Sequence, residues 1–109
     1  MTQLDVIRMI GDVLTEIDVA VGSLTPNDLQ TIKLQDLRQL LDARQLILSR
    51  KVFDDNTAAF QHAAGALKRV NDEIRGRIGR IDDMIAVLHD VTRFLDAVTS
   101  LMTTIHAFG

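Results

Sequence analysis

The sequence is most informative at first for what it lacks: it has no cysteine, tryptophan or tyrosine, and one proline in 109 residues. Without cysteine there is no disulfide framework and no thiolate zinc site. No stretch reaches the ~18 consecutive apolar residues of a membrane-spanning helix, and the N-terminal residues lack the basic start and apolar run of a signal peptide. These absences are compatible with a reducing compartment, and we expect a cytoplasmic protein.

The remaining composition favours helices throughout. Hydrophobic residues make up 47% of the chain, and helix breakers occur in only a few places, two of which clearly mark the ends of helices. Around the first, Gly22 is placed to end a helix, and Thr25 to cap the next, with Pro26 in its first turn. The second, residues 54–57, offers four N-cap residue types in succession. We therefore expect a single all-α domain over 1–109, with helices over about 2–22, 26–52 and 56–107.

The first two segments show amphipathic periodicity. In 2–22, apolar residues alternate at spacings of three and four, which predicts a helix packed in a bundle. In 26–52 the pattern is less regular and forms one broad stripe. That stripe consists of Leu29, Ile32, Leu37, Leu40, Leu41, Ile47 and Leu48.

The third segment carries a seven-residue repeat. Its first row is Phe60, Leu67, Ile74, Ile81, Leu88, Leu95 and Met102, and the row three residues later is Ala63, Val70, Arg77, Met84, Val91, Val98 and Ile105. Every position except Arg77 is apolar, which is typical of left-handed coiled-coil packing. A single polar residue in such a seam often determines register or partner identity, so Arg77 is predicted to have this role.

Two glycines, Gly76 and Gly79, leave two architectures open. Either 56–107 is one long helix with a hinge at these glycines, packed with two shorter helices, or it breaks at 76–79 to give a four-helix up-and-down bundle. In the second case Gly76 follows the end of one helix and Gly79 caps the next. The uninterrupted register favours the long helix, which is our expectation.

The wide apolar face after residue 80 predicts association with another chain. A short protein cannot cover such a face by itself, so we expect a homo-oligomer or a complex with a helical protein. The expected interface residues are Ile81, Met84, Leu88, Val91, Leu95, Val98, Met102 and Ile105.

No residue pattern indicates a chemistry. His62, His89 and His106 lack a histidine or carboxylate at metal-binding spacing, and adjacent carboxylates on a helix point about 100° apart. The basic residues between 68 and 80 are interleaved with acidic ones and lack an aromatic stacking platform. We therefore expect no catalytic residues, no metal, no cofactor and no nucleic-acid partner.

The sequence thus predicts a non-enzymatic helical interaction module, acting as an adaptor, chaperone or structural subunit through coiled-coil-like oligomerisation. The alternative is a membrane- or lipid-active helical protein, suggested by the weakly charged stretch 84–109. The scarcity of lysine and arginine in that stretch argues against the alternative, because helices at membrane surfaces usually have basic polar faces.

Overall fold

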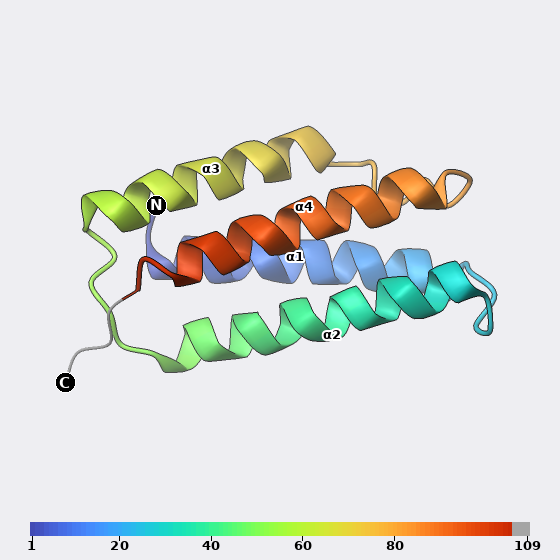
Figure 1. The fold of residues 1–109 in the computed structure, drawn as a ribbon, viewed down its shortest axis with the longest axis horizontal. Helices are drawn as coiled ribbons and strands as arrows, with labels where there is room; N and C mark the ends of the chain where they lie inside the picture. The colour runs from blue at the N-terminus through green and yellow to red at the C-terminus, as the bar shows by residue number, and fades with distance from the viewer. Residues whose placement is uncertain (106–109) are drawn as a thin grey trace.

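The computed structural model describes residues 1–105, which form four helices of similar length (Figure 1). They are α1 (Gln3–Gly22), α2 (Leu29–Arg50), α3 (Ala58–Ile74) and α4 (Met84–Met102). The described residues contain no strand. The all-α bundle is confirmed, and so are the first two helices apart from the later start of α2. The long C-terminal helix over 56–107 is wrong.

The order of the helices around the core differs from their order in the chain. α1 packs against α2, α2 against α4, and α4 against α3, whereas α3 makes only a small contact with α1. Successive helices run in opposite directions, so α2 and α4 are parallel neighbours (Figure 1). The link between α2 and α3 crosses one end of the bundle from one helix to the diagonally opposite one. α4 therefore lies between α2 and α3.

Each helix begins at a polar cap that satisfies its free backbone N–H groups. Thr2 and Asp5 form a reciprocal capping box at α1, and Thr57 caps α3, which is one of the four residues predicted there. Asp28, rather than Thr25, caps α2. Asp83 caps α4, so the prediction that Gly79 would do so is wrong.

The C-terminal segment breaks after Ile74 because Gly76 adopts a left-handed backbone conformation, with φ = +78°. This conformation ends a helix and disfavours side chains larger than glycine's hydrogen. The N–H of Arg77 donates to the carbonyl of Ile74 at 2.9 Å, and Ile78 is fully buried. The break therefore belongs to an ordered turn over 75–83 with its own anchor in the core.

The two positions of the seven-residue repeat in this turn, Arg77 and Ile81, are exposed and half-buried, whereas the buried Ile78 lies outside the repeat. The repeat is only partly correct for α4. Its most completely buried residues are Val87, Val91, Phe94, Val98 and Leu101. Val91 and Val98 belong to the expected repeat, but Val87, Phe94 and Leu101 each lie one residue before its first row, so Leu88 and Met102 lie at the edge of the core, half-buried. Two helices that face one core from opposite directions need not share a register.

Gly76→Ala should lower the free energy of unfolding by about 1 kcal/mol, because alanine is strained at positive φ. Gly79→Ala is the matched control, since Gly79 has no positive φ and a Cβ there meets no atom within 4 Å. It should cause no loss of stability. Urea denaturation of both variants measures the difference, and equal stability of the two would contradict the turn geometry.

Candidate functional site

Arg77 lies in the 75–83 turn and not in a helical seam, so its predicted role in coiled-coil register is wrong. Its Nε donates to Oδ2 of Asp90 at 3.1 Å, and its Nη2 donates to Oδ1 at 3.0 Å. Asp90 lies on α4 and is only 1% exposed, whereas Arg77 is exposed. A buried carboxylate needs such a partner, because an unpaired buried charge is costly. The pair therefore fixes the turn to α4.

Arg77→Ala should destabilise the fold by about 3 kcal/mol, because it leaves the Asp90 carboxylate buried without its cation. Arg80→Ala removes an exposed arginine from the same turn that forms no ion pair among the described residues. It should change stability by less than about 0.5 kcal/mol. Thermal and urea denaturation provide the comparison, and Arg77→Ala with Asp90→Ala should regain part of the loss. Equal effects of the two arginine variants would refute the anchor.

The small contact between α1 and α3 leaves a groove of about 420 Å³ along these helices. Its charged lining residues are Asp5, Arg8, Asp12, Lys68, Asp72 and Arg75. Both signs alternate along it, and Lys68 already binds Asp72 at 3.1 Å. Such a lining selects neither a cation nor an anion, so the groove does not define a ligand class.

Glu16 continues this side of the bundle beside Gly76 and Gly79. Burial of its half-exposed side chain raises the pKa of the carboxyl group; nearby Arg75 lowers it, and Asp12 raises it further. A raised pKa means that the folded state disfavours the ionised form. Ionisation of Glu16 therefore opposes folding.

Glu16→Gln should flatten part of the pH dependence of stability. In the wild type, the unfolded chain releases this proton near the ordinary value of 4.5, and the folded chain releases it at higher pH. The unfolding free energy therefore falls as pH rises through that interval. We expect the unfolding free energy, measured by urea denaturation at about pH 4 and about pH 7, to decrease less between these pH values in the variant than in the wild type. An identical change in both proteins would contradict the effect of burial on Glu16.

Among the four helices, α2 has the most exposed large apolar residues. Its apolar residues form two rows on different sides of the helix, where the sequence pattern showed one broad stripe. Leu34, Leu41 and Leu48 form the inner row, at most 1% exposed. The outer row consists of Leu29, Ile32, Leu40 and Ile47, which are 64%, 43%, 47% and 41% exposed. The core uses only the inner row, so five large apolar side chains of α2, these four and Leu46, remain in contact with water.

Leu40 and Ile47 of the outer row border α4 and form an apolar surface with it, which we name the α2–α4 face. Leu29 lies on the same side of α2 as these two residues, whereas Ile32 is rotated about 80° from Leu40 toward Leu46. One groove of about 280 Å³ lies between Leu37 and Leu40 on α2 and Leu88 and Thr92 on α4. A second, of about 420 Å³, lies further along and includes Ile47 and Met102. We define the α2–α4 face by Leu29, Leu40 and Ile47 of the outer row together with Leu37, Leu88 and Met102.

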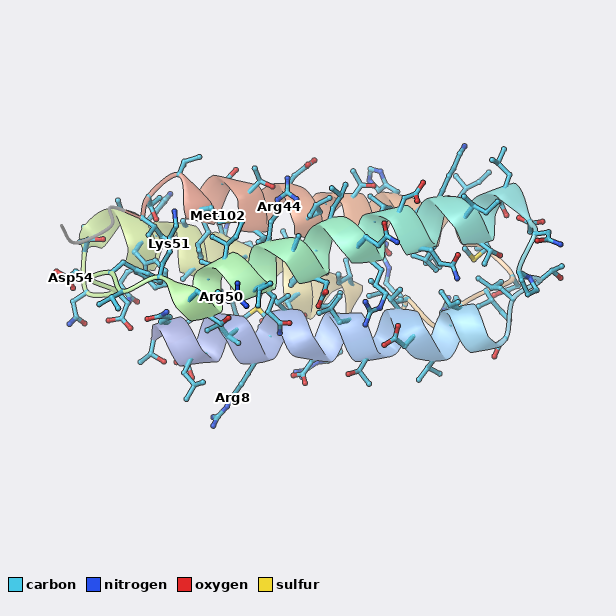
Figure 2. All side chains as sticks on the ribbon, turned by 90° about the horizontal axis from the view of Figure 1, so that it is seen from below. Arg8, Arg44, Arg50, Lys51, Asp54 and Met102 are labelled. Carbon is cyan, nitrogen blue, oxygen red and sulfur yellow. The ribbon has the colours of Figure 1, made fainter. Side chains whose placement is uncertain are left out.

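Arg44 lies on this face between the two helices. Its Nε donates to Oγ1 of Thr99 on α4 at 2.9 Å, and its Nη1 donates to the carbonyl of Leu40 at 3.1 Å. Figure 2 shows Arg44 and Met102 together along the edge where α2 lies beside α4. The arginine is therefore held in a defined position among the apolar residues of the face.

The structure separates the expected interface residues into two groups. Met84, Val91, Leu95 and Val98 are buried in the chain's own core, whereas Ile81, Leu88, Met102 and Ile105 are half-buried. Only Leu88 and Met102 line the α2–α4 face. Contact with another chain stays a prediction for the expected set. The outer row of α2 was not predicted as an interface, although the breadth of its apolar stripe was a usable signal.

The remaining expectations concern metal binding and membrane association. His62 and His89 are exposed, and His106 lies outside the described residues. Over residues 1–105 there is no group of three or more histidine and acidic side chains placed to hold a metal. Within the same range, no helix combines the length and apolarity needed to cross a membrane.

The chain was compared with protein-family models, with curated proteins and with solved structures, and none of them matches it. We therefore infer the function from the geometry of the chain itself.

Proposed function

We propose that the protein is a non-enzymatic helical interaction module that binds a protein partner through the α2–α4 face. The observation that supports this is the double row of α2. A helix that only completed a bundle would need one apolar row, with polar residues on its outer side. Here the outer side has five large apolar residues, each more than 40% exposed.

The energetic argument favours a role for this outer row. Burying a leucine or isoleucine side chain contributes about 1.5–3 kcal/mol, so the outer row offers several kcal/mol to any partner that covers it. Extended apolar patches on soluble proteins usually mark interaction sites. The neighbouring α4 residues Leu88 and Met102 extend the patch, and methionine adapts readily to a partner's shape.

Two other surface features are less suitable as the main binding site. The α1–α3 groove carries charges of both signs, and the Arg77–Asp90 pair is satisfied within the chain. Neither of them exposes a row of large apolar side chains like the outer row of α2. An adaptor, chaperone or structural subunit would each use such a face.

Leu40→Glu should abolish partner binding, because it places a carboxylate at the middle of the α2–α4 face. Leu46→Glu is a closely matched control: Leu46 is 48% exposed against 47% for Leu40, on the same helix. Leu46 is six residues after Leu40, which corresponds to a rotation of about 120° around the helix axis, so Leu46 lies off the face. Both variants should melt like the wild type, since neither changes a buried residue.

The measurement is affinity capture from the organism that encodes the protein, with the wild type and both variants as bait. Proteins retained by the wild type and by Leu46→Glu should be missing from Leu40→Glu. Recovery of the same proteins with all three baits would show that the α2–α4 face is not the binding surface.

A further inference from the structure

We propose that the occupant of the α2–α4 face is a second copy of this chain, with the two α2 helices antiparallel about a two-fold axis at Leu40. This inference rests on the proposed function and specifies its partner. It follows from the placement of the charged residues among the outer row of α2.

Asp36, Leu40 and Arg44 are spaced by four residues, so they share one side of α2. Asp36 and Arg44 lie about 6 Å along the helix axis on either side of Leu40, at 1.5 Å per residue. In an antiparallel copy, each residue before Leu40 meets the residue equally far after it. Asp36 of one copy therefore faces Arg44 of the other, and symmetry forms this contact twice.

Both charged groups are available for such contacts. Asp36 is exposed and takes part in none of the ion pairs found in residues 1–105. Arg44 uses Nε and Nη1 for Thr99 and Leu40, which holds the guanidinium on the face while Nη2 can still donate. By contrast, Arg38 on another side of α2 already binds Asp18 of α1. The α2 charges on this face are thus the ones left to a partner.

The apolar residues suit the same arrangement. Leu40 meets its own counterpart at the axis, and the methylene stem of Lys33 covers Ile47 of the second copy, as long basic side chains commonly do. The face runs from Leu29 to Ile47, about 27 Å, and is two helices, or about 20 Å, wide, which gives about 540 Å² per chain. Two chains would bury about 1,100 Å² in total, which is at the lower end of the range for specific interfaces.

The symmetry of the charges distinguishes a second copy from other occupants. A different protein partner would not require opposite charges equally spaced about one residue. A membrane surface would not favour Asp36 within the apolar area, because anionic lipids repel a carboxylate. Only a copy of the same face complements both charges at once.

The test uses charge reversal and its compensation, measured by sedimentation velocity over a range of concentrations. The wild type should reach twice the chain mass of 12.1 kDa. Asp36→Arg and Arg44→Asp should each raise the dimer Kd by about tenfold or more, since each creates two like-charge contacts. The double variant Asp36→Arg with Arg44→Asp should restore the affinity. Asp42→Arg, the same charge change at another exposed α2 position, is the control and should leave the Kd unchanged.

Mixing the two single variants gives the most specific result. At positions 36 and 44, Asp36→Arg chains carry two cations and Arg44→Asp chains carry two anions, while Lys33 is the same in both. The mixture should therefore form heterodimers although each variant alone is mainly monomeric. Native mass spectrometry detects these pairs, and circular dichroism verifies that every variant is folded. The Asp36→Arg arm leaves the contacts of Arg44 within the chain intact.

A wild type that stays at 12.1 kDa at every concentration tested would overturn the inference. So would a dimer that responds equally to Asp36→Arg and Asp42→Arg, or a mixture without heterodimers. These results would leave the proposed function standing if Leu40→Glu still lost a captured partner. If capture is also unaffected by Leu40→Glu, the proposed function itself fails.

Discussion

The turn over 75–83 is the constraint on which the rest of this structure depends. Gly76 ends α3 through its left-handed conformation, Ile78 enters the core, and Arg77 reaches the buried carboxylate of Asp90 on α4. Together these features fold the C-terminal half of the chain back on itself. Without the turn, α4 could not lie between α2 and α3, and the core would lose a helix that contributes eight buried residues.

The position of α4 determines which surfaces remain free. α4 presents a wide apolar side to the core, and α1 does the same, with seven buried residues. α2 contributes a narrow inner row to this core and has no room to bury its outer row as well. The exposed apolar area of α2 is therefore a consequence of how well the other helices fill the interior. It is also the feature from which we infer binding.

Charge placement converts that apolar area into a selective surface. Apolar contact alone is non-directional, so it does not determine the orientation of a partner. Opposite charges at equal distances from Leu40 define both a direction and a register, while contributing little to affinity by themselves. In the proposed dimer, the leucine and isoleucine side chains provide most of the free energy, and Asp36 and Arg44 provide the specificity.

The sequence by itself determined the helical class, the extent of α1 and a capping site for α3 within residues 54–57, because these depend on periodicity and on local hydrogen bonds. It also contained the signal for the break at Gly76, but local preference could not decide between a hinge and a turn. That choice depends on the burial of Ile78 and on the ion pair between Arg77 and Asp90, which are thirteen residues apart in the chain. Only the tertiary structure also decided that Met84, Val91 and Val98 belong to the chain's own core and that Leu40 and Ile47 face outward. A stripe of apolar residues shows that a helix side can be buried, but the packing of the other helices decides which part of it is.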